Sequence, residues 1–232
     1  GHAGVEASLV ACYMGSIVAL VTMDPTAIGR MSCNPAIGGL AKGQMVREVD
    51  VLGGVMGLFA DRSGIQFKVL NKKKGRAVWS PRAQIDKRQY EKLVRGAVKN
   101  SDVDIVVGEV VSVKEVSGRV RSVLLRSGEE IKTVSAIITS GTFLSGVIHI
   151  GERKINAGRM GEERAEGLTE SLHSIGLRSA RLKTGTPPRI EKSSIDWTKT
   201  MEASGDIEPV PFSYSTQSFN PPNIPCHTIK TN

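Results

Sequence analysis

The first residues of the chain constrain its fold more than any other stretch. They consist of a glycine-containing turn, "GHAG", then a segment of small residues that ends near Gly15, then the apolar run "SIVALVT" over residues 16–22. A glycine turn, a helix and a buried strand in this order form the second half of a dinucleotide-binding βαβ unit. The first strand of that unit would precede Gly1, so we expect the chain to begin inside a G-x-G-x-x-G loop.

Gly1 and Gly4 take the places of the second and third glycines of that loop. The second lets the backbone approach a pyrophosphate, the third lets the helix pack closely on the sheet, and the helix N-terminus attracts the phosphate charge. A tight strand–helix turn without a ligand has the same spacing. The acidic residue that usually follows about 20 positions later is replaced by Thr22, whose hydroxyl is expected to meet a ribose.

Composition excludes several classes of protein. The 232 residues are 40% hydrophobic, which suits one large globular domain or one and a half ordinary ones. The three cysteines show no CxxC spacing, which argues against a disulfide framework or zinc site and favours a reducing compartment. The four histidines show no metal-ligand spacing, so no metal is expected. No apolar run is long enough to span a membrane. The net charge of +8 is compatible with a polyanionic partner.

Further along, the pattern predicts a helix over residues 40–52 and an amphipathic helix after Asp86, which is placed to cap it. A period of two then predicts a β-meander over residues 104–133, with three or four strands. An apolar strand, "SAIITSG", leads into "TFLSG", where Gly141 and Thr142 offer backbone to a cofactor. A meander inserted between the halves of a sheet is typical of flavoprotein domains, so FAD is favoured over NAD.

The sequence therefore predicts an α/β fold. Residues 1–190 are expected to form a Rossmann-like FAD-binding domain, with a central parallel sheet that lacks its first strand. A helix ending at Gly176 and a further strand are expected to close it. Residues 191–232 are expected to begin an inserted α/β domain for substrate or NAD, left incomplete. Phe212, Tyr214 and Phe219 argue that this segment is packed.

One cysteine stands in an unusual setting. Cys33 lies in "MSCNPAIGG", where Pro35 fixes the backbone and Gly38 and Gly39 allow close approach to a ligand. The loop is expected to lead into a helix with Lys42 nearby, which would favour a thiolate. The residues alone leave two interpretations open: a reactive thiol, or a small buried side chain.

A basic run follows at residues 68–88, with Trp79 beside it. Its candidate phosphate contacts are Lys72, Lys73, Lys74, Arg76 and Arg82. Such a run favours a nucleic acid, but a solvated loop has the same composition.

Several stretches together resemble the MnmG/GidA family of tRNA uridine 5-carboxymethylaminomethyl modification enzymes. They are "GHAG", "MSCNPAIGG", "KGQMVREVDVLGG", "GIQFKVLN", "PRAQIDKRQY", "GTFLSGVIHIG" and "RLKTGTPPRI". Order and spacing are kept over nearly the whole chain, which would match the N-terminal third of such a protein.

The resemblance implies an FAD enzyme that uses NADH and methylenetetrahydrofolate to build a (carboxymethyl)aminomethyl group on C5 of the wobble uridine of tRNA. It implies a homodimer that works with an MnmE-like GTPase in a heterotetramer, in the cytoplasm or the mitochondrial matrix. Cys33 matches an essential cysteine. The implied FAD contacts are Gly1, His2, Ala3 and Gly4 at the pyrophosphate and the Val111 backbone at the adenine. Separately, we expect the loop of Cys33 to form the floor beside the flavin ring, with Asn34, Gly38 and Gly39 as its cofactor contacts. Residues 1–232 alone are expected to be inactive.

One stretch departs from the family pattern. Where the family often has "GRAGEPPS", this chain has "GRMGEERAEG", so Ala165 replaces a serine near the cofactor and a charged run replaces the prolines. Two other functions stay open. One is a folate- and FAD-dependent tRNA uridine C5-methyltransferase, and the other is a flavin- or RNA-binding module without turnover.

Overall fold

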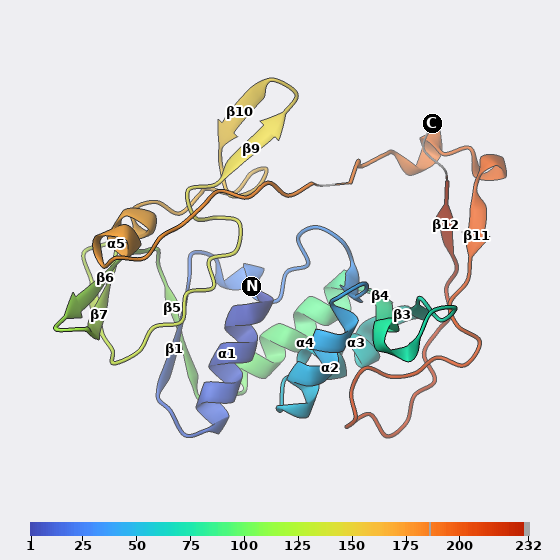
Figure 1. The fold of residues 1–232 in the computed structure, drawn as a ribbon, viewed down its shortest axis with the longest axis horizontal. Helices are drawn as coiled ribbons and strands as arrows, with labels where there is room; N and C mark the ends of the chain where they lie inside the picture. The colour runs from blue at the N-terminus through green and yellow to red at the C-terminus, as the bar shows by residue number, and fades with distance from the viewer. Residues whose placement is uncertain (186, 230–232) are drawn as a thin grey trace. The chain divides into compact units, whose positions relative to one another are not determined.

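The structure is a computed structural model that describes residues 1–185 and 187–229. The chain divides into two compact units. Figure 1 colours the ribbon by residue number, from blue at the N-terminus to red at the C-terminus. The first unit contains residues 1–28 and 101–183, and the second contains residues 29–100 and the chain from 184 onward. This division differs from the expected boundary at residue 190, because residues 29–100 belong to the second unit.

The first unit opens with the helix and strand that the sequence predicts. Helix α1 (His2–Tyr13) ends where Gly15 adopts a φ of 84°, and it lies against the parallel pair β1 (Val18–Thr22) and β5 (Val103–Val107). A left-handed glycine just after a helix is a common stop signal. The buried residues of α1 are Gly4, Val5, Ser8 and Leu9.

The predicted meander is shorter than expected. Its three antiparallel strands are β6 (Val110–Val116), β7 (Arg119–Leu125) and β8 (Glu130–Lys132), and α5 (Leu168–Ser174) packs on β6. The prediction that the meander starts near residue 104 is wrong, because residues 103–107 form β5 and pair with β1. The sequence analysis also missed the hairpin of β9 (Val147–Ile150) and β10 (Arg153–Asn156).

Two predicted strands are absent. Residues 135–140 are not part of a strand, and Ile137 in this stretch is 69% exposed. Residues 177–185 are likewise without regular structure; residue 186 of the same predicted strand lies outside the described residues. Apolar, β-branched composition favours a strand, but a strand also needs a partner, and composition does not supply one.

The second unit contains an antiparallel sheet that the sequence analysis did not predict. Its strand order is β2 (Ala36–Gly38), β4 (Ser80–Ile85), β3 (Gly64–Leu70). Helices α2 (Gly43–Val51) and α3 (Met56–Ser63) pack against it, and α3 also contacts α4 (Lys87–Lys99).

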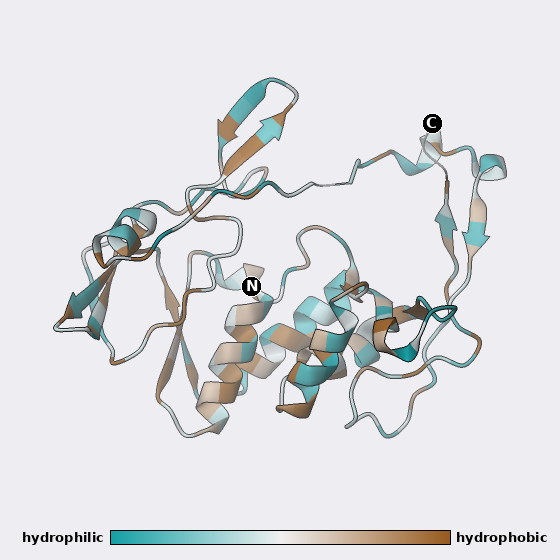
Figure 2. Ribbon diagram, in the orientation of Figure 1, coloured by the Kyte–Doolittle hydropathy of each residue, from teal (hydrophilic) through white to brown (hydrophobic). Residues whose placement is uncertain are grey.

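The prediction for α4 is confirmed. The Asp86 carboxylate accepts hydrogen bonds from the amides of Arg88 (2.9 Å) and Gln89 (3.1 Å). Tyr90, Val94 and Val98 are each 1% exposed, so the predicted apolar face is buried. Figure 2 shows this amphipathic character as brown and teal residues on the same helix.

Residues 187–229 consist mainly of extended loops. The regular elements in this described stretch are four short ones: η3 (Lys192–Ser194), η4 (Trp197–Lys199), β11 (Met201–Ala203) and β12 (Cys226–Thr228). Phe212 is 1% exposed, and the Phe219 ring meets the Phe67 ring edge to face at a centroid distance of 4.8 Å. Tyr214, also expected to pack, is 72% exposed. Two other 3-10 turns are η1 (Pro25–Ala27) and η2 (Arg76–Val78).

Candidate functional site

The N-terminal end of α1 has the features that a phosphate group requires. Gly1 is its N-cap, no side chain caps the first turn, and the first turn carries no acidic residue. Backbone amides at such an end attract an anion. Gly4 lies so close to the stretch at residues 135–140 that a Cβ there would be 2.9 Å from Thr139 Oγ1. These features fit the pyrophosphate end of a dinucleotide.

Two further predicted cofactor residues belong to the first unit. Val111 lies where the register between β6 and β7 shifts, between the pairs Val110–Leu125 and Ser112–Leu124. A bulge of this kind leaves backbone groups outside the sheet ladder, where they are available to a ligand. Thr22 ends β1, and its hydroxyl donates a hydrogen bond to the Asp24 carbonyl (3.2 Å).

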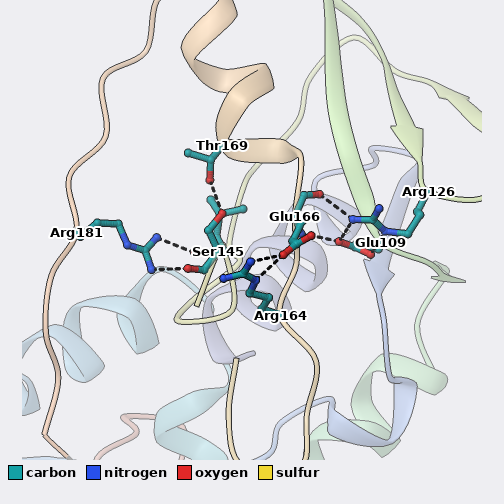
Figure 3. Close-up of polar contacts among 8 residues, drawn as sticks. Glu109, Arg126, Ser145, Arg164, Glu166, Thr169 and Arg181 are labelled. Atoms are coloured by element: carbon teal, nitrogen blue, oxygen red, sulfur yellow. Dashed lines mark hydrogen bonds and ion pairs between the residues drawn. The ribbon is translucent and has the colours of Figure 1, made fainter. Parts of the chain in front are cut away.

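Gly141 and Thr142 are exposed, and Gly141 has a φ of 61° with open space where a Cβ would stand. The next residues form a fixed turn. Ser145 donates its amide hydrogen to the Ala165 carbonyl (2.8 Å), and the carbonyls of Leu144 and Ser145 each accept a hydrogen bond of 2.8 Å from the Arg181 guanidinium. Figure 3 shows Arg181 aimed at this turn.

The charged run that departs from the family pattern forms an ordered network. Arg126 donates to the Glu109 carboxylate and to the Glu166 carbonyl, and the Glu166 amide donates to Glu109 Oε1 (2.7 Å) (Figure 3). Arg164 pairs with the Glu166 side chain. The hydrogen bond from Arg126 is the main reason that the pKa of Glu109 lies below its ordinary value. Ala165 contributes main-chain bonds to both Phe143 and Ser145.

Cys33 belongs to the second unit and is an exposed, free cysteine. Its carbonyl accepts a hydrogen bond from the Arg189 guanidinium. The helix predicted over residues 40–52 is confirmed as α2, which begins at Gly43. The strand β2 lies between Cys33 and this helix in the sequence, so the loop does not lead directly into it.

The glycines beside Cys33 have a packing explanation. Gly38 has a φ of 76°, and a Cβ there would lie 2.2 Å from the Pro81 carbonyl oxygen and 2.7 Å from the Phe212 ring. Gly39 has a φ of 100°. Asn34 is exposed. The flavin contacts expected of these three residues remain a prediction.

The basic segment is the loop between β3 and β4, together with Arg82 inside β4. Lys72, Lys73, Lys74 and Arg76 are exposed, and Arg82 is half-buried. The loop is hydrophilic in Figure 2. The Arg76 guanidinium lies 5.6 Å from the centre of the Trp79 ring, and Lys72 pairs with Asp206 at 2.8 Å. Lys72 therefore already has an acidic partner, which sequence reasoning did not find.

A buried carboxylate anchors the chain at residues 211–216. Asp61 is 8% exposed and accepts hydrogen bonds from the amides of Phe212 (2.8 Å) and Ser213 (2.9 Å) and from the Thr216 hydroxyl (2.6 Å). Burial raises the pKa of Asp61 above its ordinary value, and the nearby charge of Asp50 adds to this. Sequence reasoning missed this anchor, as it missed Arg181 and Arg189, because partners distant in sequence leave no local pattern.

The predicted site residues thus fall into two sets. Those of the first unit are Gly1, His2, Ala3, Gly4, Thr22, Val111, Gly141 and Thr142. Those of the second are Cys33, Asn34, Gly38, Gly39 and the basic segment. Over residues 1–185 and 187–229, no group of three or more histidine, cysteine or acidic side chains could hold a metal ion. In the same described residues, no helix has both the length and the apolar character needed to cross a bilayer.

Comparison with known proteins decides the family. Residues 1–232 match the protein family described as Glucose inhibited division protein A. The chain belongs to this family. The resemblance predicted from the sequence motifs is therefore confirmed.

Curated members and a solved structure agree with this assignment. The tRNA uridine 5-carboxymethylaminomethyl modification enzyme MnmG of Chlorobaculum tepidum is 50% identical over 234 residues, covering 100% of this chain and 38% of that protein. The protein of the same name from Thermodesulfovibrio yellowstonii is 47% identical, with coverages of 100% and 37%. The structure of Aquifex aeolicus GidA (form II crystal) has a TM-score of 0.92 at 44% identity, over 98% of this chain and 39% of that one. The predicted α/β class is confirmed by that likeness, and the chain spans well under half the length of these relatives.

Proposed function

We propose that the full-length protein containing this chain is an FAD-dependent tRNA-modifying enzyme that adds a (carboxymethyl)aminomethyl group to C5 of the wobble uridine. The observation that carries this proposal is the similarity over the whole chain to proteins named for that modification, at 50% and 47% identity. Methylenetetrahydrofolate is the carbon donor and NADH the reductant. The enzyme is a homodimer that acts with an MnmE-like GTPase in a heterotetramer.

The first unit is the Rossmann-like part of the FAD site. The amides at the start of α1, from Gly1 to Gly4, bind the pyrophosphate, which their uncapped helix end supports. The backbone of Val111 contacts the adenine, and its place at a bulge supports this role. Thr22 lies at the ribose, and Gly141 and Thr142 lie against the cofactor. FAD, when bound, supplies the redox chemistry of the reaction.

Cys33 is the catalytic residue in this proposal. Its thiol reacts with the bound uridine or with the folate-derived carbon, and its exposure on a loop supports access to a substrate. Asn34, Gly38 and Gly39 form the floor of the site beside the flavin ring. The hydrogen bond from Arg189 to the Cys33 carbonyl holds the loop at the cysteine itself.

The basic segment contacts the tRNA. Lys73, Lys74 and Arg76 are exposed, and phosphates require such charge. Trp79 lies next to Arg76 and adds a ring on which a base or sugar can pack. Lys72 and Arg82 complete the set.

The experiment is nucleoside analysis of tRNA from cells that lack the protein and are then supplied with the full-length protein. The proposal expects the modified wobble uridine to return, and to be absent when Cys33→Ser is supplied instead. A C5-methyl product would support a folate- and FAD-dependent methyltransferase. Unmodified tRNA together with a bound flavin spectrum would support a non-catalytic module.

A further inference from the structure

The turn that follows Thr142 contains a residue in a costly backbone conformation. Ser145 has a φ of 48°, in the left-handed region that residues other than glycine seldom occupy. Such a residue persists only when its surroundings determine the conformation, and these positions cluster at ligand-binding sites.

Three parts of the first unit hold Ser145. Its amide donates to the Ala165 carbonyl (2.8 Å), and its hydroxyl lies 3.3 Å from the Thr169 hydroxyl. Its carbonyl accepts from Arg181 Nη2, while Arg181 Nη1 donates to the preceding carbonyl of Leu144, both at 2.8 Å. Figure 3 shows Arg181 and Thr169 converging on Ser145. The planar guanidinium thus fixes two consecutive carbonyls at once, which a lysine ammonium cannot do with the same geometry.

The turn is continuous with the predicted cofactor contacts. The Phe143 amide donates to the Ser140 carbonyl (3.3 Å), and the Gly146 amide donates to the Phe143 carbonyl (3.1 Å). Gly141 and Thr142 lie inside this series of turns. A change in the backbone of Ser145 is therefore passed along a few peptide bonds to the residues that would touch the cofactor.

We propose that Arg181 is a positioning residue for the cofactor: it holds Ser145 in the left-handed conformation and so fixes Gly141 and Thr142 against FAD. This proposal rests on the proposed FAD-binding function. Arg181 does not touch the cofactor in this account. Its effect passes through Ser145, and a substitution at Ser145 can therefore remove the need for it.

The test is a double-mutant cycle in the full-length protein, with the dissociation constant of FAD measured by flavin fluorescence. Arg181→Met is expected to weaken FAD binding roughly 5- to 50-fold, and Arg181→Lys by less, because one donor is retained. Ser145→Gly adopts a positive φ without strain. In the Ser145→Gly background, Arg181→Met is therefore expected to weaken binding by no more than about 2-fold.

The matched control is Arg178→Met, at an exposed arginine on the same segment. It should leave FAD affinity unchanged. Thermal unfolding of each variant without FAD checks that a loss of affinity is not a loss of fold.

Each outcome decides the proposal. If the unchanged protein binds FAD and Arg181→Met binds it equally well, Arg181 has no positioning role. If Arg181→Met weakens binding equally with Ser145 and with glycine at that position, it does not act through Ser145, and the proposal is overturned. If the unchanged protein binds no FAD, the proposed function itself fails, and the positioning role fails with it.

Discussion

Two loops that carry proposed site residues, one in each unit, differ in how the structure holds them. In the first unit, the turn at residues 141–146 has its amides, carbonyls and a hydroxyl engaged by neighbouring segments, with Arg181 on two consecutive carbonyls. In the second unit, residues 31–35 lead into β2, and their main chain is held by the Glu91 carboxylate at the Met31 amide (3.3 Å), by the Ile85 amide at the Pro35 carbonyl (2.8 Å) and by Arg189 at the Cys33 carbonyl. The cysteine side chain itself is exposed. Both arginines come from the stretch "RLKTGTPPRI".

The difference follows from what each loop is proposed to do. A loop that binds a cofactor through its backbone must keep that backbone fixed, because lost order lowers affinity directly. In a loop that carries a nucleophile, the main chain must be fixed while the nucleophilic side chain stays accessible to the substrate. One residue type, arginine, serves both because its donors match main-chain carbonyls.

The largest expected effect separates a catalytic thiol from a packed one. Cys33→Ser nearly preserves size but removes the thiol, so we expect wobble-uridine modification to fall roughly 10³-fold or more. FAD affinity and tRNA binding should stay unchanged. The measurement is the rate of product formation, by nucleoside analysis with purified full-length protein.

The matched control is Cys12→Ser, at a half-buried cysteine in α1. It should keep nearly full activity. If Cys33→Ser modifies tRNA at close to the unchanged rate, the cysteine is structural. The loop that contains it would then not be a loop that carries a nucleophile.

The next effect tests whether the two arginines have separate tasks. Arg189→Met removes the hydrogen bond to the Cys33 carbonyl, so we expect the turnover number to fall about 10- to 100-fold through misplacement of the thiol. FAD affinity should not change, in contrast to Arg181→Met. Arg189→Lys retains one donor and should recover part of the turnover. Equal loss of FAD affinity in the Arg189 and Arg181 variants would show that the two loops do not act separately.

The sequence predicted elements whose signals are local. The Asp86 cap and the apolar face of α4 lie within a few residues of one another, and both are confirmed. The α1–β1 succession and the stop at Gly176, with a φ of 90°, have the same local basis. The family was also predictable, because long motifs keep their order over the whole chain.

The predictions that failed, and the contacts that were missed, depend on partners that are distant in the sequence. An alternating pattern at residues 103–107 indicates a strand, but it does not reveal that the strand pairs with β1 rather than with β6. Residues 135–140 have strand-like composition without strand pairing. The contacts of Asp61, Arg181 and Arg189 join residues far apart in the chain, so no pattern of sequence spacing predicts them.

A smaller effect concerns the surface of the second unit. We expect the triple substitution of Lys73, Lys74 and Arg76 by alanine to weaken tRNA binding and flatten its salt dependence. Each lost phosphate contact lowers the slope of log K against log salt by about 0.9 on duplex and about 0.7 on a single strand. Lys72→Ala should change the slope less, because Lys72 already pairs with Asp206. An unchanged slope in the triple variant would identify the segment as a solvated loop.

The smallest expected effect concerns Asp61. The two arginines donate hydrogen bonds to main-chain carbonyls, whereas the Asp61 carboxylate accepts hydrogen bonds from main-chain amides. Burial raises the pKa of Asp61, so the folded state binds its proton more tightly than the unfolded state. The contribution of Asp61 to the local opening free energy of residues 211–216 should therefore fall as pH rises from about 4 through the folded pKa. Asp61→Asn removes this titration. The asparagine side chain has one acceptor oxygen where the aspartate has two, so one donor loses its partner. We therefore expect the local opening free energy to fall by about 1–2 kcal/mol.

The measurement is hydrogen exchange at the Phe212 and Ser213 amides, both bound to Asp61, corrected for the intrinsic exchange rate at each pH. The difference in opening free energy between the unchanged protein and Asp61→Asn should shrink as pH rises. Asp50→Asn is the matched control: it removes the nearby charge that also raises the pKa of Asp61, so the decline should move to lower pH. A difference that grows with pH would mean that the three donors stabilise the Asp61 charge by more than burial costs it. Asp61 would then stabilise residues 211–216 in its charged form. It would resemble the two arginines, which also bind main-chain groups as charged side chains.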